Sequence, residues 1–196
     1  MSYTKISDKI ERVDARTKAR GEAKYVCDLT FPEMQYAYMV RSTCPRGKIL
    51  KIDVPQMPKG YRFISAEDIP EKGKNELWMI SKDWRAFAKD YVLYVGETIG
   101  LVVGPDRTVL KYLRDNIHVE YEAQEPAVTI DDGIASKGGP MFPEKGNNVF
   151  CSLYCEKGKD MEEVFKDADE IFEETIETGY QEHVHLETNG AIATIE

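Results

Sequence analysis

The sequence predicts a mixed α/β (α+β) fold, in which one complete unit is followed by the beginning of a second. Short β-rich runs separated by turn residues fill the first 130 residues. One of these runs, Thr98–Val103 (TIGLVV), is apolar throughout, as a strand buried on both faces would be. After residue 130 the chain becomes rich in Gly, Pro, Asp and Lys before apolar runs resume, which indicates a connection between two units.

The early strands are predicted from β-rich runs bounded by turn residues. They cover Tyr36–Ser42, Lys48–Val54 and Arg62–Ser65, with turns at Cys44–Gly47 and Pro55–Gly60. Ser65 has the composition of a helix N-cap, because acids follow it at Glu67 and Asp68. Pro70 stops this helix after one turn, so a turn is expected here.

The centre of the first unit is predicted around the apolar strand. We expect Tyr91–Val95 and Thr98–Val103 to form a strand pair joined at Gly96-Glu97. A helix over Asp106–Asn116 should pack on the sheet through one apolar face, made by Val109, Leu110, Leu113 and Ile117. Strand alternation then returns at His118–Glu122, and the unit as a whole should extend from about Tyr25 to Pro126.

Three segments are expected along the chain: residues 1–130 with an N-terminal arm, a linker over 131–148, and a second unit over 149–196. The second unit should contain a strand, a short helix, an extended run and a final strand, at Val149–Cys155, Asp160–Asp167, Glu170–His185 and Ala191–Ile195. A final unpaired strand leaves backbone groups unsatisfied. The second unit is therefore expected to be incomplete, with an edge at Ala191–Ile195 that would favour self-association.

Composition narrows the class of protein. The 196 residues are 42% hydrophobic, with 35 acidic against 26 basic side chains and a net charge of −9. Basic residues are scattered, so we expect no nucleic-acid partner. No apolar run approaches the roughly 20 residues needed to span a bilayer, and the first residues do not resemble a signal peptide, so a cytoplasmic protein without a membrane partner is expected. The four cysteines are too irregularly spaced for a disulfide framework, and reduced thiols are expected.

The segment Gln181–Glu187 (QEHVHLE) has the most chemically versatile side chains in the chain. In an extended strand His183 and His185 would share a face, as two metal ligands do. Three interpretations remain open, namely structural support, contact with a cofactor channel, and an independent metal site. Together with Cys151 and Cys155, the two histidines have the composition of a Cys2His2 zinc site. Cys151 and Cys155 are four positions apart, however, and in a strand they would lie roughly 13 Å from each other, too far to share one ion. We therefore predict that these two thiols and two imidazoles form no metal site, and structural support is the preferred interpretation of the Gln181–Glu187 segment.

Two other patterns also have simpler explanations. Gly96, Gly100 and Gly104 are spaced by four and lack the pattern of a phosphate-binding loop, so they are interpreted as turn and packing glycines. The acidic run Asp160–Asp169 is typical of an exposed helix face with a favourable N-terminal charge.

A series of short motifs resembles the molybdenum-binding large subunits of the xanthine dehydrogenase/aldehyde oxidase family of molybdenum hydroxylases. The first is Arg12-Val13-Asp14 with Lys18, Gly21, Ala23, Tyr25 and Asp28. It is followed in family order by Val40–Ser42 with Pro45 and Gly47, Ile52-Asp53, Ser65–Pro70, Tyr94–Ile99, Val119–Glu122, Gly158–Asp160, Ala168-Asp169, Gln181–His183 and Leu186-Glu187. Two departures are Thr108–Arg114, where the family has an alanine-rich helix, and Glu97 in the hairpin.

The resemblance implies an α/β-hammerhead domain followed by the first strands of a molybdopterin-binding domain. In the family the hammerhead is a scaffold, and the residues that hold molybdopterin, with a catalytic glutamate, lie beyond the position of Glu196. The resemblance therefore implies no catalytic residue in this chain and no bound cofactor. Gln181, Glu182 and His183 are the candidates for residues near the cofactor.

Two functions follow as hypotheses. The first is the N-terminal scaffold of a hydroxylase subunit that oxidises purines, N-heterocycles or aldehydes with water-derived oxygen at molybdenum. Its electrons would leave through iron–sulfur clusters to FAD, and these would be bound by partner subunits because the first motif begins so near Met1. The remainder of the molybdenum subunit would be a further partner. The alternative is a free-standing hammerhead module that binds or assembles without catalysis, and the sequence beyond Glu196 would distinguish the two.

Overall fold

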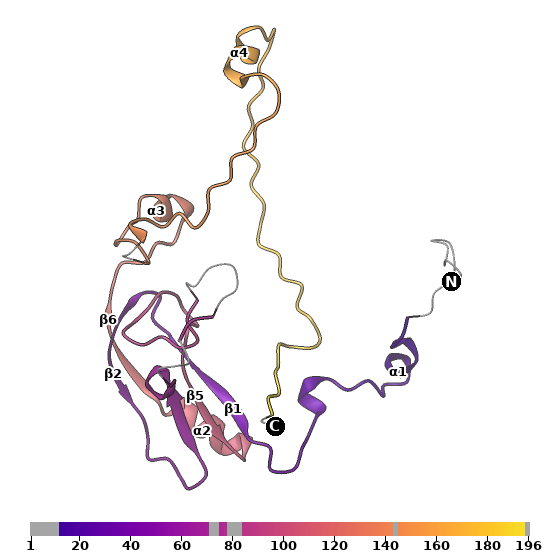
Figure 1. Ribbon diagram of the computed structural model, residues 1–196, viewed down its shortest axis with the longest axis vertical. Helices are drawn as coiled ribbons and strands as arrows, with labels where there is room; N and C mark the ends of the chain where they lie inside the picture. The colour runs from indigo at the N-terminus through magenta and orange to yellow at the C-terminus, as the bar shows by residue number, and fades with distance from the viewer. Residues whose placement is uncertain (1–11, 71–74, 78–83, 143–144, 195–196) are drawn as a thin grey trace. The chain divides into compact units, whose positions relative to one another are not determined.

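The computed structural model describes residues 12–70, 75–77, 84–142 and 145–194 (Figure 1). The chain divides into two compact units. One comprises residues 33–157, and the other combines residues 1–32 with residues 158–196. No helix in the described ranges is long and apolar enough to cross a membrane.

Residues 33–157 form two antiparallel three-stranded sheets with the strand orders β1-β5-β3 and β4-β2-β6. The strands are β1 (Tyr36–Arg41), β2 (Gly47–Asp53), β3 (Arg62–Ser65), β4 (Tyr91–Val92), β5 (Thr98–Gly104) and β6 (His118–Ala123). The predicted strands over residues 36–42, 48–54, 62–65 and 118–122 are thereby confirmed to within a residue or two at each end.

Strand β5 is central in its sheet, as predicted from its apolar sequence. Val40 of β1 and Ser65 of β3 both lie opposite Gly100, one on each side. Ile99 and Val102 are completely buried. A Cβ atom at Gly100 would lie 2.5 Å from the carbonyl oxygen of Ile64, so only glycine permits the two strands to approach this closely.

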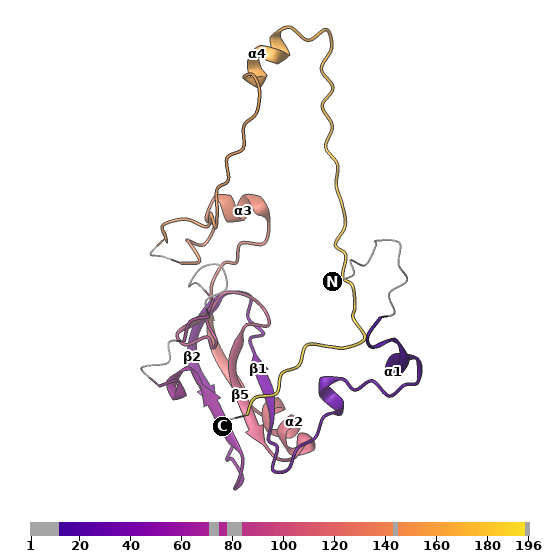
Figure 2. The ribbon, with the colours of Figure 1, turned by 45° about the vertical axis from the view of Figure 1, so that its right-hand side comes forward.

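Helix α2 (Arg107–Asp115) covers the sheet of β1 and β5 (Figure 2). The carboxylate of Asp106 caps it by accepting a hydrogen bond of 2.9 Å from the backbone N–H of Val109. Leu110 and Leu113 are buried and pack in one cluster with Val40, Val102 and Ile117. The amphipathic helix and its predicted packing face are confirmed.

The predicted pairing of residues 91–95 with 98–103 is wrong. Strand β4 has two residues and pairs with β2 in the other sheet. The reason lies at the turn, where the Glu97 carboxylate accepts the N–H of Leu93 at 2.6 Å. Gly96 has a φ of 92° and donates its N–H to Ser42, whose own N–H donates to the Glu97 carbonyl. These bonds satisfy the backbone groups of the turn through Leu93 and through Ser42, the residue after β1, and the preceding residues are directed away from β5.

Short helices occupy the remaining parts of the chain. The one-turn helix predicted after Ser65 is a 3-10 turn over Ala66–Asp68 that Ser65 caps, and α4 (Met161–Lys166) lies within the predicted range with Asp160 as its N-cap. Three others had no counterpart in the sequence analysis: α1 (Ala15–Ala19), a 3-10 turn over Val26–Asp28, and α3 (Ile130–Ile134).

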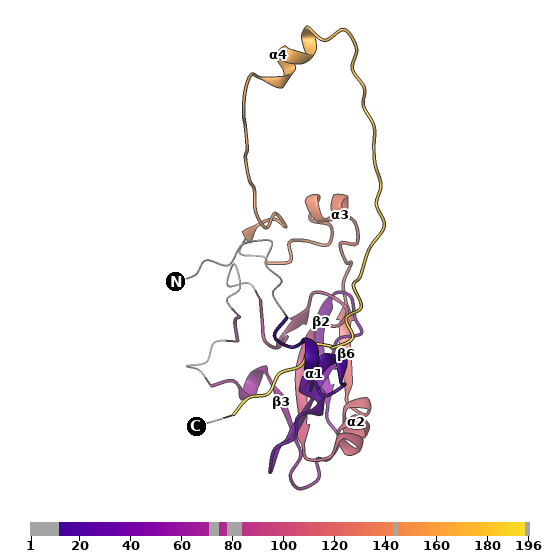
Figure 3. The ribbon, with the colours of Figure 1, turned by 90° about the vertical axis from the view of Figure 1, so that its right-hand side faces the viewer.

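The strands predicted in the second unit are not formed. Apart from α4, residues 149–194 follow an irregular course without a strand (Figure 3). In the described part of the chain Val149–Cys155 has no ladder partner, and neither do residues 191–194 of the predicted last strand, whose residue 195 lies outside the described ranges. A β-rich run becomes a strand only when another strand satisfies its backbone groups, and residues 145–194 supply none to each other.

We predict that truncating Leu110 weakens the first unit severely. Leu110→Ala would empty a fully buried position between α2 and the sheet, which costs about 2–5 kcal/mol of unfolding free energy. Tyr112→Ala on the same helix, at a side chain 66% exposed, is the control and should change stability by about 0.5 kcal/mol or less. Urea unfolding followed by circular dichroism measures both, and equal losses would contradict the packing described above.

Candidate functional site

The segment Gln181–Glu187 is exposed throughout. The Glu182 carboxylate accepts the backbone N–H groups of His183 at 3.0 Å and of Val184 at 3.4 Å. Val184 has a φ of 45°, in the left-handed region that β-branched residues avoid. The chain therefore bends here, which differs from the straight strand on which the shared histidine face was predicted. The rings of His183 and His185 are nevertheless neighbours, with centroids 5.8 Å apart.

The four cysteines are free thiols, as expected. Cys151 and Cys155 are exposed, and Cys44 is buried, where its thiol donates to the carbonyl oxygen of Arg46 at 3.1 Å. Within the described ranges, no three His, Cys, Asp or Glu side chains gather as a metal site would require. Among the described residues, the imidazoles of His183 and His185 therefore have no third metal ligand beside them.

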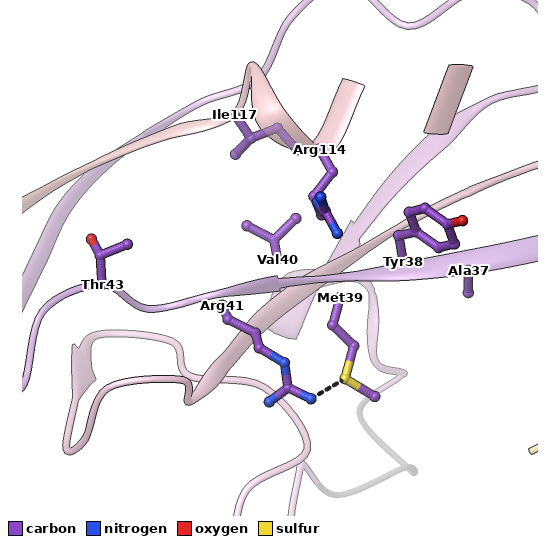
Figure 4. Close-up of a pocket in the computed structure, with 8 residues that line it drawn as sticks. All are labelled: Ala37, Tyr38, Met39, Val40, Arg41, Thr43, Arg114 and Ile117. Carbon is purple, nitrogen blue, oxygen red and sulfur yellow. Dashed lines mark hydrogen bonds between the residues drawn. The ribbon is translucent and has the colours of Figure 1, made fainter. Parts of the chain in front are cut away.

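A shallow hollow of about 520 Å³ lies along β1 (Figure 4). Its lining residues come from β1, the following loop, and the end of α2: Ala37, Tyr38, Met39, Val40, Arg41, Thr43, Arg114 and Ile117. The guanidinium of Arg41 donates to the Met39 sulfur at 2.9 Å and to the Gly96 carbonyl at 2.7 Å. None of these described lining residues carries a carboxylate, imidazole or thiol, so the hydroxyl groups of Tyr38 and Thr43 have no base among them that would activate a nucleophile.

Arg46 ties the segment after β6 to the sheets of the same unit. It is only 8% exposed, and its guanidinium donates to three backbone carbonyls, of Lys137 (3.4 Å), Gly139 (3.0 Å) and Pro140 (3.4 Å). A planar guanidinium suits this task because its donors diverge in a fixed fork. This role of Arg46 could not be predicted from the sequence, since Arg46 lies in a turn between strands and its partners are about 90 residues away.

The segment that Arg46 holds is itself ordered by local bonds. Thr129 caps α3, and the backbone N–H groups of Thr129 and Val128 donate to the Asp132 carboxylate, which lowers the pKa of Asp132. Gly138 has a φ of 72°, and a Cβ atom there would lie 2.3 Å from the Glu125 carbonyl oxygen. The Asn148 side chain accepts from the N–H of Met141 and donates to the Gly133 carbonyl. Residues 129–142 and 145–148 are therefore held together by bonds among themselves.

The buried side chain of Glu97 forms an ion pair with the partly buried Arg85. A guanidinium nitrogen of Arg85 lies 2.5 Å from a carboxylate oxygen of Glu97, with side chains 17% and 7% exposed. The guanidinium also stacks 4.5 Å from the ring centroid of Tyr91. Because the second carboxylate oxygen accepts the N–H of Leu93, the carboxylate is paired on both sides. This cluster holds the turn before β5 and has no free group for chemistry.

The motif at the start of the described chain is also structural. Asp14 is held by Lys18 at 2.7 Å and by Arg12 at 2.5 Å, at the beginning of α1. The hydrogen bond from Lys18, and then the one from Arg12, lower the pKa of Asp14 to about 2. Both cations are thus paired with the one carboxylate of Asp14 at the start of α1, and the three side chains present no open site.

Comparison with known proteins gives two consecutive family matches. Residues 20–125 match the family described as aldehyde oxidase and xanthine dehydrogenase, a/b hammerhead domain. Residues 141–196 match the molybdopterin cofactor-binding domain. The first match covers the strands and α2, whereas the second covers α4 and the Gln181–Glu187 segment.

Individual relatives agree with these matches. A probable xanthine dehydrogenase subunit of Bacillus subtilis is 30% identical over 94% of this chain and 25% of its own length. The nicotinate dehydrogenase large molybdopterin subunit of Eubacterium barkeri is 27% identical over 93% of this chain and 42% of its own. Aldehyde oxidoreductase from Desulfovibrio gigas shares the fold with a TM-score of 0.63 at 21% identity, over 81% of this chain and 19% of its own. The chain thus spans less than half the length of these relatives.

Replacing Arg46 should loosen the segment it holds. Arg46→Lys keeps the charge but loses the fork of donors to three carbonyls, so we expect a loss of about 1–3 kcal/mol in unfolding free energy. Trypsin should also cleave after Lys137 several-fold faster. Arg62→Lys, at an exposed position of β3, is the matched control. If trypsin cleaves after Lys137 no faster in Arg46→Lys than in the control, Arg46 does not hold the backbone of residues 137–140.

The pKa of Asp14 provides a test by titration. The carboxyl carbon of Asp14, followed by NMR, should titrate at about 2, and Lys18→Gln should raise this pKa toward the ordinary value of 3.8. Because the folded pKa is depressed, this interaction stabilises α1 above about pH 4 and its contribution is lost as the pH falls toward 2. An Asp14 that titrates near 3.8 in the unsubstituted chain would contradict the two ion pairs.

Proposed function

Because the chain belongs to the aldehyde oxidase and xanthine dehydrogenase family, we propose that it is the N-terminal scaffold of a molybdenum-binding hydroxylase subunit. The proposed enzyme oxidises purines, N-heterocycles or aldehydes with water-derived oxygen. One observation carries the proposal, which is that a hammerhead match is followed directly by a molybdopterin cofactor-binding match in the same chain. A free-standing hammerhead module would not need the second.

The buried core of residues 33–157 and the internal pairing of their charged groups support a scaffold role. Residues 33–157 bury a core, and their charged clusters at Arg46 and at Arg85–Glu97 are saturated by internal partners. We propose that residues 1–130 form the hammerhead domain with its N-terminal arm. Residues 131–148 would connect it to the cofactor domain, which begins at 149. Arg46 then fixes where this connection leaves the hammerhead.

The side chains of the Gln181–Glu187 segment fit one polar edge of a molybdenum cofactor. The Gln181 amide both donates and accepts, and the His183 imidazole can donate. The Glu182 carboxylate, in contrast, already accepts two backbone N–H groups of its own segment. Phosphate and pterin need several converging donors, which the described residues of this segment do not gather. The remainder of the subunit is therefore proposed to supply them.

We assign Gln181 and His183 as residues that contact the cofactor edge, and Glu182 as the residue that shapes the bend before Val184. When bound, the molybdenum cofactor accepts the electrons removed from the substrate. The residues of this chain would orient it and would not act as acid or base. No catalytic residue is proposed among them.

The partners proposed for this chain follow from the same assignment. The relatives named above include a subunit of a probable xanthine dehydrogenase and a large molybdopterin subunit. We propose separate FAD-binding and iron–sulfur subunits that take up the electrons, and a cytoplasmic assembly. The run Ala191–Ile195 would pair with the rest of the subunit, or with a second copy when that remainder is missing.

The test compares this 196-residue chain with the reading frame extended past Glu196, both produced in a molybdenum-replete host that makes the cofactor. We expect molybdenum close to one atom per chain, and turnover with an artificial electron acceptor, only for the extended protein. Gln181→Ala there should lower turnover by on the order of 10–100-fold, whereas Thr178→Ala, at an exposed neighbour, should not. Molybdenum and turnover in the 196-residue chain would overturn the scaffold assignment.

A further inference from the structure

The 3-10 turn at Val26–Asp28 has one backbone donor directed at a distant segment. Its own bonds are local, since the Asp28 carboxylate accepts the N–H of Tyr25 at 3.0 Å and the Asp28 N–H donates to the Tyr25 carbonyl at 3.0 Å. The N–H of Val26 instead donates to a carboxylate oxygen of Glu187 at 3.1 Å. These two residues are 161 positions apart in sequence and belong to the same compact unit.

A second contact joins the same two segments. A Cβ atom placed on Gly190 would lie 3.0 Å from Cγ1 and 3.3 Å from Cβ of Val26. The backbone of Gly190 therefore sits directly against the Val26 side chain, and any larger residue would have to displace it. Gly179, earlier in the same segment, has nothing within 4 Å of such an atom, so this closeness is particular to Gly190.

We propose that Val26, Glu187 and Gly190 form a clasp, by which the 3-10 turn at Val26–Asp28 positions the Gln181–His183 segment. Glu187 and Gly190 are then positioning residues, because they act on Gln181–His183 through the backbone. The contacts among Val26, Glu187 and Gly190 do not depend on the proposed function. The role of the Gln181–His183 segment that they position does rest on it.

Residues 168–194 need a contact such as the clasp because they have little structure of their own. They contain no helix or strand and their side chains are exposed, so no ladder or core fixes their course. Glu187 follows His183 by four residues, which is at most roughly 14 Å of extended chain. Holding Glu187 at the 3-10 turn therefore confines Gln181–His183 to a small region near it. A charge-assisted bond from a backbone N–H to a carboxylate is suited to this, since it is stronger and more directional than a neutral one.

The first test measures backbone amide exchange by NMR in the 196-residue chain. Glu187→Ala should accelerate exchange at Val26, which reports the clasp, and at His183, which reports positioning, each about tenfold. Gly190→Ala should do the same by displacing Val26, and Glu187→Gln should restore part of the protection because its amide oxygen still accepts. Glu177→Ala and Gly179→Ala, in the same exposed run, are the matched controls and should leave both rates unchanged.

The second test uses the extended protein with its cofactor. Glu187→Ala should lower turnover per bound molybdenum about tenfold while the molybdenum content stays within about twofold, since misplacement affects the reaction more than retention. Glu187→Gln should recover most of this loss, which a general loss of folding would not allow. Glu177→Ala again serves as the control.

The two tests separate the possible failures. Unchanged exchange at Val26 in both Glu187→Ala and Gly190→Ala would refute the clasp, and faster exchange at Val26 alone, without a change at His183, would refute positioning. Normal turnover per molybdenum in Glu187→Ala would also refute a role in the reaction. An extended protein without molybdenum or turnover would overturn the proposed function, and the exchange rates would still decide on the clasp and on positioning.

Discussion

The burial of β5 between β1 and β3 is the constraint on which the first unit depends. A strand that is paired along both edges, and in which Ile99 and Val102 are completely buried, must have its backbone groups bonded and no buried polar side chain that lacks a partner. Its sequence meets this condition, and Gly100 removes the one side chain that would hold β3 away. Helix α2 then closes the outer face of the sheet through Leu110 and Leu113.

Three polar arrangements extend from this core and are each saturated. Arg85 and Glu97 fix the turn that enters β5, Arg46 holds the backbone of residues 137–140, and Arg41 satisfies the carbonyl of Gly96. A buried charge without a partner is strongly unfavourable, so the buried side chains of Arg46 and Glu97 are committed to structure, whereas Arg41 is exposed and only bonds to the turn. This commitment is what a scaffold requires, and it explains why these charged groups of the well-packed unit are not available for chemistry.

The compact unit made of residues 1–32 and 158–196 is organised differently, because none of its described side chains is buried. Its order comes from single contacts, namely the caps of the short helices, the bend at Val184, and the bond between Val26 and Glu187. A segment built in this way is not stable through its own packing. This chain spans 25% of the Bacillus subtilis relative and 19% of the Desulfovibrio gigas enzyme.

The sequence by itself determined the elements whose signals are local. The apolar run of β5, the single apolar face of α2, the cap at Ser65 and the short helix after residue 160 could all be predicted, and the ordered motifs indicated the family. The tertiary structure alone decided which strands pair. It placed β4 beside β2, left Val149–Cys155 unpaired, and brought Arg46 to Lys137 and Val26 to Glu187. Strand pairing and these contacts join residues far apart in the chain, and their bonds depend on geometry that no local pattern of residue types records.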